Sequence, residues 1–317
     1  MELGNFLHSN KIFYENNVRL STKTWVKTGG TCKYWIIPIS VQQLSVLCAY
    51  LIDSKISFDI IGNTSNIFFH STYNPKVVVS TVKMNNYQID GDILTCESGV
   101  NVMKLAKEMV AKGYAGFYGL VGLPGTVGAA AVNNAGCFGC SISSMLISAE
   151  VLLPDATVKT YLKEDFGYEK RSSAFKRGET KGVILTVKLK LQRAVNVEEE
   201  FRKSEETKLY RKKNQEGPAK NLGSIFSQMT LRYNYRNRIA ANMANMLGRF
   251  KLSDKKRAYK WFILWFYGYR DLYPYISDKL LNTFIWRDEY AEKKFVRYKE
   301  LMGKVYDNLE QEIEERK

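Results

Sequence analysis

The sequence is poor in the residues that build metal sites and disulfides. It has only two histidines, His8 and His70, and its five cysteines are scattered along the chain. Cys137 and Cys140 form a CxxC pair, but no second pair is present to complete a zinc site. We therefore expect no metal site and free thiols. A redox role for the CxxC pair is the weaker alternative.

Long apolar stretches are also missing. Residues 1–17 mix charged, polar and aromatic side chains, so they do not resemble a signal peptide. The longest apolar run, Trp261–Tyr267, is far shorter than the ~20 residues that a membrane-spanning helix needs. With 317 residues and 45% apolar composition, the chain has room for two or three globular domains. We expect a cytoplasmic protein.

Acidic residues are few relative to basic ones. The chain has 47 Lys and Arg against 32 Asp and Glu, a net charge of +15, and residues 202–260 hold sixteen of these cations against four acids. Such a face usually has an anionic partner, and a sugar phosphate, a polyprenyl-phosphate lipid or an anionic membrane would fit. A solvated helix face is the alternative. No nucleic-acid motif is present, so no nucleic acid is expected.

Membrane contact is one interpretation of the basic and aromatic residues in 202–267. Trp261, Phe262, Trp265 and Phe266 lie within this region. Aromatic side chains next to basic ones are typical of an interfacial surface. A buried core helix is the competing interpretation of the same residues, and the one that we favour.

One stretch, Gly116–Ser144, has no charged side chain and seven glycines. Glycine lets the backbone approach another group closely, because it has no Cβ and adopts conformations closed to other residues. Successive backbone N–H groups in such turns form concavities that suit a pyrophosphate. The alternative is a set of tight turns between packed strands. The G-x-G-x-x-G of a Rossmann turn is absent.

The order of residues in this stretch is specific. Leu123–Gly128, then Asn134–Gly136 and Phe138–Gly139, resemble the flavin-binding signature of the UDP-N-acetylenolpyruvoylglucosamine reductase (MurB) family. The resemblance implies FAD as cofactor and an FAD-binding fold of the vanillyl-alcohol oxidase (PCMH) type. The cofactor-binding residues that it implies here are Gly122, Pro124, Gly125, Thr126, Gly128, Asn134, Ala135 and Gly136.

An earlier turn carries a second part of the resemblance. Residues 62–67 follow a predicted strand at 56–61 and resemble the family's GxGSN turn over the FAD pyrophosphate. Thr64 stands at the second glycine. Thr is strained at positive φ, so the loop either changes shape or gains a hydroxyl donor. The implied cofactor-binding residues in this turn are Gly62, Asn63, Thr64, Ser65 and Asn66.

Periodicity and motifs together indicate an α+β chain. Ser40 reads as the N-cap of a helix, with Gln43 as its capping-box partner. We expect a two-subdomain FAD-binding fold followed by a C-terminal substrate domain that is α/β or mostly helical. The predicted boundaries are 1–75 and 76–196 for the FAD-binding subdomains and 197–317 for the substrate domain.

The predicted C-terminal domain keeps little of the family pattern between residues 229 and 283. We expect an aromatic-rich helix over Ala258–Tyr273 that is stopped by Pro274. Five apolar residues fall on one face of an earlier helix, and four on the inward face of a later one. They are Ile239, Met243, Met246, Leu247 and Phe250, and Phe295, Tyr298, Met302 and Val305.

Residues for substrate binding are implied by a short basic segment. Lys170–Lys176 resembles the family's YRxSxFK element, which puts Arg171 at the catalytic arginine and Lys170 at the usual tyrosine. Arg171 would bind a substrate carboxylate bidentately. Tyr168 would replace the missing tyrosine only if the turn is rearranged. An ion pair on the basic surface is the structural alternative for Arg171.

Two further residues complete the implied catalytic set. Asn221–Phe226 resembles an AGSFFKNP element and places Ser224 at the proton-donating serine, while residues 309–313 resemble an LEPEV element that offers Glu312 for charge and proton handling. The alternatives are a turn residue for Ser224 and an exposed tail charge for Glu312.

The resemblance implies an enzyme that transfers hydride from NADPH or NADH through FAD to an enolpyruvyl ether of a sugar, giving a lactyl ether. Cell-wall precursor synthesis is the default setting, with UDP-N-acetylglucosamine enolpyruvate as substrate. The altered segment 229–283 favours a different acceptor, such as a capsule or lipid-linked sugar. Another flavin-dependent sugar oxidoreductase and a non-catalytic flavin-binding partner are the alternatives.

Overall fold

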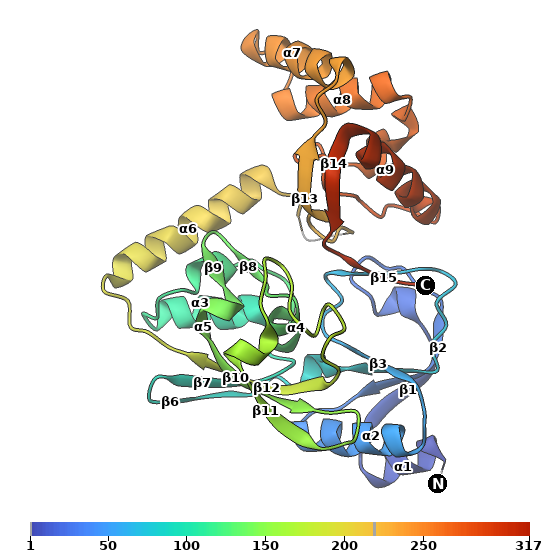
Figure 1. Cartoon of the computed structure of the whole chain (residues 1–317), viewed down its shortest axis with the longest axis vertical. Coiled ribbons are helices and arrows are strands. Elements are labelled where there is room, and N and C mark those ends of the chain that lie inside the picture. The colour runs from blue at the N-terminus through green and yellow to red at the C-terminus, as the bar shows by residue number, and fades with distance from the viewer. Residues whose placement is uncertain (1, 218–219) are drawn as a thin grey trace. The chain divides into compact units, whose positions relative to one another are not determined.

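A computed structural model describes residues 2–217 and 220–317 (Figure 1). The chain divides into two compact units. Unit 1 comprises Met1–Arg19, Thr31–Thr64 and Asn74–Leu209, and unit 2 comprises Leu20–Gly30, Ser65–Tyr73 and Tyr210–Lys317. Two short segments from the N-terminal part of the chain therefore belong to the C-terminal unit.

Unit 1 begins with a four-stranded sheet of order β1-β2-β5-β3. The first pair is antiparallel, and β5 runs parallel to both of its neighbours. One face of this sheet packs against the buried leucines of the second helix. The elements are α1 (Leu3–Ser9), β1 (Phe13–Arg19), β2 (Thr31–Ile37), α2 (Val41–Asp53), β3 (Phe58–Ile61), β5 (Val77–Ser80) and the 3₁₀ turn η2 (Thr81–Lys83).

The start of α2 follows directly from its sequence. Ser40 has extended backbone, and its side chain accepts a hydrogen bond from the Gln43 N–H. The Gln43 side chain in turn accepts from the Ile39 N–H at 3.0 Å. These bonds satisfy backbone donors that a helix start leaves without intrahelical partners. The predicted N-cap at Ser40 is confirmed.

The second sheet of unit 1 is five-stranded and antiparallel, in the order β11-β10-β12-β7-β6. Its strands are β6 (Tyr87–Asp90), β7 (Ile93–Glu97), β10 (Leu146–Leu152), β11 (Val158–Leu162) and β12 (Val183–Lys190). The other elements of this region are α3 (Val102–Ala111), η3 (Tyr118–Leu120), α4 (Val127–Val132), β8 (Gly136–Cys137), β9 (Cys140–Ser141), α5 (Ile142–Met145), η4 (Lys163–Phe166) and the start of α6 (Val197–Asn214).

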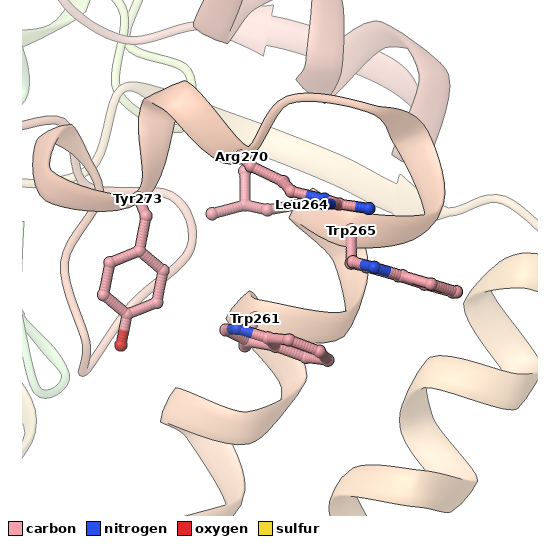
Figure 2. Close-up of a pocket in the computed structure, with 5 residues that line it drawn as sticks. All are labelled: Trp261, Leu264, Trp265, Arg270 and Tyr273. Atoms are coloured by element: carbon pink, nitrogen blue, oxygen red, sulfur yellow. The ribbon is translucent and has the colours of Figure 1, made fainter.

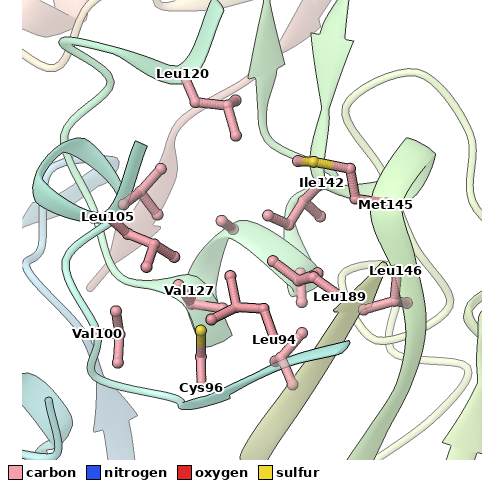
Figure 3. Close-up of a cluster of buried hydrophobic side chains, with 14 of the residues drawn as sticks. Leu94, Cys96, Val100, Leu105, Leu120, Val127, Ile142, Met145, Leu146 and Leu189 are labelled. Atoms are coloured by element: carbon pink, nitrogen blue, oxygen red, sulfur yellow. The ribbon is translucent and has the colours of Figure 1, made fainter. Parts of the chain in front are cut away.

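A buried cluster fills the space beside this sheet. Figure 3 shows Val127 of α4 among side chains from the sheet, including Leu94 and Leu189, with Leu105 from α3 in the same cluster. All four are at most 4% exposed. Because α4 is anchored by its apolar side chains, the backbone turns on either side of it are held in fixed positions.

Unit 2 combines a helical part with two short strand pairs. Strands β13 (Phe226–Leu231) and β14 (Tyr306–Gln311) pair antiparallel, and β15 (Glu314–Arg316) pairs parallel with β4 (Ile67–Phe69). The inward-facing residues predicted for the last helix, Phe295, Tyr298, Met302 and Val305, have no exposed surface. The remaining elements are η1 (Leu20–Thr22), α7 (Tyr235–Arg249), α8 (Lys255–Tyr267), η5 (Arg270–Tyr275) and α9 (Ala291–Val305).

Two expectations for this region were wrong in part. The aromatic helix α8 ends at Gly268, which has a left-handed backbone with φ of 78°, before it reaches Pro274. On α7, Ala240 and Ala244 are buried, whereas Ile239 is 40% and Met246 is 52% exposed. Small side chains let α7 pack closely against α8, so the larger residues beside them face solvent.

The α+β class is confirmed by this mixture of sheets and helices. The three-domain division at 1–75, 76–196 and 197–317 stays a prediction. Within the described ranges 2–217 and 220–317, no helix combines the length and the apolar character that a membrane crossing requires.

Candidate functional site

The start of α4 is the point where the predicted cofactor residues of unit 1 meet. A Cβ on Gly62 would lie 2.3 Å from Thr126 Oγ1, so only glycine allows the 62–64 turn to approach α4 this closely. Gly128 donates its N–H to the Ser98 carbonyl at 2.8 Å, and a Cβ there would lie 2.7 Å from Ser98 Cβ. Two turns predicted separately from the sequence are thus one structural feature.

Left-handed backbone recurs around this point. Gly122 and Gly125 have φ of 86° and 137°, and the non-glycine residues Thr64 and Asn134 have φ of 54° and 45°. Thr64 is 4% exposed. The sequence predicted that threonine at this position would either change the shape of the loop or add a hydroxyl donor. Because Thr64 itself adopts the left-handed conformation, the loop does not have to change its shape. A β-branched residue at positive φ is an outlier, and such strain concentrates at functional sites.

Arg171 lies at the tip of a tight turn beside Asn134. Glu169 and Ser172 exchange backbone hydrogen bonds of 3.2 and 3.1 Å, which leaves only Lys170 and Arg171 between them. The Asn134 amide donates to the Glu169 carbonyl at 2.7 Å, and Arg171 Nη1 lies 3.5 Å from the Asn134 carbonyl oxygen. The turn is therefore held against the Asn134 loop, and Arg171 has a left-handed φ of 59°.

The same turn is anchored to α4 by two hydroxyls. Tyr168 donates its O–H to the Ala131 carbonyl at 3.0 Å, and Ser173 donates to the Val132 carbonyl at 2.6 Å. Burial raises the pKa of the Tyr168 phenol. In this geometry Tyr168 remains protonated and fixes the turn, while Lys170 is exposed at its tip.

The region leaves polar atoms that a bound group could satisfy. Ser98 Oγ, Asn133 Oδ1 and Asn134 Oδ1 are buried and have no hydrogen-bond partner within residues 2–217 and 220–317. Buried acceptors are normally satisfied, so these atoms require an explanation. Hydroxyl and ring N–H donors, which FAD carries, would satisfy them. The glycine-lined turns and these acceptors therefore fit FAD.

Unit 2 brings Ser224, just before β13, close to Glu312, just after β14. The Glu312 N–H donates to the carbonyl of Ile225, the residue after Ser224, at 2.8 Å. Ser224 is exposed and follows Gly223, whose φ is 76°. Glu312 is half-buried in the turn between β14 and β15. The two predicted residues, 88 positions apart in sequence, thus lie on one local surface.

Three asparagines hold this pair, and sequence reasoning assigned none of them that role. Asn66 donates its amide to the Glu312 carbonyl at 3.2 Å and accepts from the Glu314 N–H at 2.9 Å. Asn282 brackets Phe226, accepting from its N–H at 3.0 Å and donating to its carbonyl at 2.8 Å.

The third asparagine, Asn221, supports the turn before Ser224. Its side chain accepts from the Gly223 N–H at 3.0 Å, and its carbonyl accepts from Trp25 Nε1 at 2.9 Å. Asn66 lies in the turn that resembles the GxGSN element, so that motif was a signal for the region but not for these contacts. Asn282 lies in no motif.

The other predicted cofactor residues lie on the same turns as those described above. Within the two described ranges, no group of three His, Cys, Asp or Glu side chains could hold a metal ion. Asn63 follows Gly62 and Ser65 precedes Asn66, Pro124 lies between Gly122 and Gly125, and Ala135 precedes Gly136, the first residue of β8.

Comparisons with known proteins match the region that holds the predicted cofactor residues. Residues 32–161 match the family model described as FAD binding domain. The UDP-N-acetylenolpyruvoylglucosamine reductase of Enterococcus faecalis is 29% identical over 66% of this chain, and that of Caldicellulosiruptor bescii is 30% identical over 58%. These alignments span 69% and 58% of the relatives' own lengths.

The fold match extends further than the sequence match. The crystal structure of UDP-N-acetylenolpyruvylglucosamine reductase (MurB) from Thermus caldophilus matches 96% of this chain and all of its own, with a TM-score of 0.67 and 21% identity. The FAD-binding fold of the vanillyl-alcohol oxidase type and FAD as the cofactor, both predicted from the sequence, are confirmed.

Proposed function

We propose that this divergent member of the UDP-N-acetylenolpyruvoylglucosamine reductase (MurB) family reduces an enolpyruvyl ether of a sugar to a lactyl ether. The observation that carries the proposal is the Arg171 turn, which is fixed to Asn134 beside the glycine-lined turns at α4. FAD, when bound, takes reducing equivalents from NADPH or NADH and supplies the hydride. Gly62, Thr126, Gly128 and Asn134 would hold it.

Arg171 would bind the substrate carboxylate. Its guanidinium can form two parallel hydrogen bonds to a carboxylate and stabilise negative charge that grows on the adjacent carbon. The tight 169–172 turn and its bond to Asn134 restrict where the arginine can go, which reduces the entropy lost on binding. Lys170, exposed at the tip of the same turn, adds a second cation.

Ser224 would deliver the proton to the carbon next to the carboxylate. A serine hydroxyl is a weak acid, so it needs a neighbour that handles charge. Glu312 is suited to this role because its backbone is bonded to the residue after Ser224. Together Arg171, Ser224 and Glu312 are the proposed catalytic residues.

The proposed substrate is a UDP-linked sugar, by analogy with the names of the relatives. A capsule-type or lipid-linked sugar is the second candidate. Its support is the segment 229–283, which carries eleven Lys and Arg against three Asp. Such a charge excess would attract a phosphate-bearing acceptor.

Stopped-flow absorbance of the oxidised flavin tests the proposal. Anaerobic NADPH should bleach the band, and UDP-N-acetylglucosamine enolpyruvate should restore it. Bleaching without recovery would move the search to capsule-type and lipid-linked enolpyruvyl sugars. Reoxidation that requires only oxygen, with hydrogen peroxide formed from a saturated sugar, would replace the proposal by a sugar oxidase.

Variants separate catalysis from flavin binding. Arg171→Ala and Ser224→Ala should keep flavin and its reduction by NADPH but slow reoxidation by substrate by about a hundredfold or more. Arg202→Ala is the matched control, because Arg202 pairs with Glu206 on the exposed face of α6. If both alanine variants reoxidise as fast as the parent protein, Arg171 and Ser224 are not catalytic. Normal flavin content and unchanged function in the host for both variants, without turnover of any enolpyruvyl sugar by the parent, would indicate a non-catalytic flavin-binding partner.

Membrane contact through residues 202–267 is a separate proposal, supported by the same charge excess and by exposed Met246, Phe250 and Leu252. Co-sedimentation with phosphatidylglycerol vesicles tests it. Binding should weaken steeply with salt, and vesicles of neutral lipid should not bind. Equal binding to both kinds of vesicle, or to neither, would reject it.

A further inference from the structure

Helix α8 presents two tryptophans on its outer face. Trp261 and Trp265 are one helical turn apart, with ring centroids 6.3 Å apart and planes inclined by only 9°. They are 49% and 44% exposed, whereas Phe262, Ile263 and Leu264 of the same helix are buried. Figure 2 shows the two indoles edge-on, one above the other along the helix, and together they form an apolar platform on its outer face.

The chain after α8 turns this platform into a pocket. Gly268 ends the helix in the left-handed conformation, and η5 then runs back past the tryptophans. The pocket has a volume of about 300 Å³ and is lined by Trp261, Leu264, Trp265, Arg270 and Tyr273. In Figure 2, Arg270 lies over Trp265 and Tyr273 stands across from the indoles.

The cations around the pocket differ in how far they are already neutralised. Lys260 pairs with Asp278 and donates to the Tyr273 and Ile276 carbonyls, and Arg257 donates to the Tyr273 hydroxyl at 3.1 Å. Arg270 packs its guanidinium 5.5 Å from the Trp265 ring centre. It makes no hydrogen bond or ion pair to any residue in the described part of the chain. Arg270 is therefore the cation in the pocket still available to an anion.

This combination selects a particular ligand chemistry. The axial C–H face of a pyranose ring is flat and apolar enough to pack on an indole, while its hydroxyls stay in water. A guanidinium pairs with phosphate or carboxylate through two hydrogen bonds. A volume near 300 Å³ is at the lower end of ligand pockets and suits a single ring.

We infer that the pocket between α8 and η5 binds a single pyranose unit that carries a phosphate or a carboxylate. The sugar ring packs against the apolar surfaces of Trp261 and Trp265 that line the pocket, and Arg270 binds the anionic group. None of these residues belongs to the flavin-binding or catalytic set, so the inference does not depend on the proposed reaction.

Isothermal titration calorimetry on the flavin-loaded protein tests it with defined probes. Glucose 1-phosphate and glucuronate should bind, while glucose and inorganic phosphate should each bind at least about tenfold more weakly, because each offers only half of the contacts. Comparison of the two acidic sugars identifies the preferred anion. Equal affinity for inorganic phosphate and glucose 1-phosphate would leave only a non-specific cationic surface and would overturn the inference.

Substitutions localise the binding. Trp265→Ala and Arg270→Ala should each weaken binding of glucose 1-phosphate about tenfold or more. Arg270→Lys should weaken it less than Arg270→Ala, because lysine keeps the positive charge but lacks the planar pair of N–H donors. Tyr233→Ala and Arg249→Ala are matched controls, because both residues are exposed in the same unit and neither lines the pocket. Circular dichroism confirms that each variant is folded.

Two further results would contradict the inference. Unchanged affinity in Trp265→Ala and Arg270→Ala would place the binding outside the pocket. Loss of phosphatidylglycerol-vesicle binding in the same variants, without any binding of acidic sugars to the parent protein, would make the platform a membrane contact. Flavin reduction by NADPH is measured on every variant, so failure of the proposed reaction is seen separately from failure of this inference.

Discussion

Gly62 and Thr126 illustrate how a glycine-rich motif acquires a physical meaning. The two residues are 64 positions apart, yet the backbone of one contacts the side chain of the other so closely that a Cβ cannot fit. Thr64, two residues later, adopts the left-handed conformation that a glycine would adopt more easily. Strain of this kind persists only where the surrounding structure holds the residue in place.

Gly62→Ala is expected to lower flavin content. The added methyl group must displace Thr126 or the 62–64 turn. Both lie within residues 32–161, the range that matches the FAD binding domain, so either movement alters the predicted cofactor site. The ratio of flavin to protein absorbance measures the effect, and a loss of about tenfold or more in FAD affinity is expected. Gly303→Ala is the control, since no atom outside α9 lies near its Cβ. Full flavin content in both variants would contradict the expectation.

Asn66 has two competing interpretations that one variant separates. Its motif implies contact with FAD, but its amide donates to the Glu312 carbonyl and its carbonyl accepts from Glu314. We expect Asn66→Ala to keep its flavin and its reduction by NADPH, and to reoxidise with substrate about tenfold more slowly, because Glu312 is no longer fixed. The two half-reactions are followed separately by stopped flow. Loss of flavin instead would support the role implied by the motif.

The strand pair β4–β15 is tied down by ionic groups at its end. His70 ring nitrogens lie 2.8 Å from Glu292 and 2.9 Å from Glu315, and Lys299 lies 2.6 Å from the other Glu315 oxygen. Burial acts to raise the pKa of the Glu315 carboxyl, but the hydrogen bonds from Lys299 and His70 outweigh it and hold that pKa below its ordinary value. The carboxylate form is therefore the one that the folded unit stabilises.

The sign of the pH dependence follows from this lowered pKa. Glu315 stabilises the fold fully above its unfolded-state pKa, and this contribution is lost as pH falls through the lower folded-state value. We expect Glu315→Gln to have a lower Tm than the parent at pH 6 and a smaller further loss between pH 6 and pH 4. Glu289→Gln, an exposed glutamate in the same unit, is the control. Parallel Tm curves for all three proteins would rule out this role.

The complete molecule is best tested through its cofactor. A ligand that binds only the folded state stabilises it by mass action, by about 2.7 kcal/mol when free ligand is a hundredfold above Kd. We expect FAD added to flavin-free protein to raise the free energy of unfolding by that order, as measured by urea denaturation. FMN lacks the second phosphate and the adenosine and should stabilise less. The same effect from both would argue against a pyrophosphate-binding role for the glycine turns.

Much of the local structure could be predicted because it depends on neighbours in sequence. Ser40 caps α2 through a residue three positions on, and the apolar stripe of α9 follows from a repeat that every helix imposes. Helix α7 shows where this kind of prediction fails. Its apolar repeat predicted that the larger residues form the buried face, but the small residues Ala240 and Ala244 are the ones that are buried. The assignment of the flavin-turn residues to FAD stays a prediction, and the structure adds to it the close approach of Gly62 to Thr126 at the start of α4.

The amino-acid sequence by itself therefore determined the main helices and strands, the cofactor and the candidate catalytic residues. The tertiary structure alone decided that residues 65–73 join the C-terminal unit, that Asn66 and Asn282 support Glu312 and Ser224, and that Trp261, Arg270 and Tyr273 enclose a pocket. These contacts join residues whose separation in sequence carries no periodic signal. They form because burying apolar surface brings distant segments together, and hydrogen bonds then select the partners that remain.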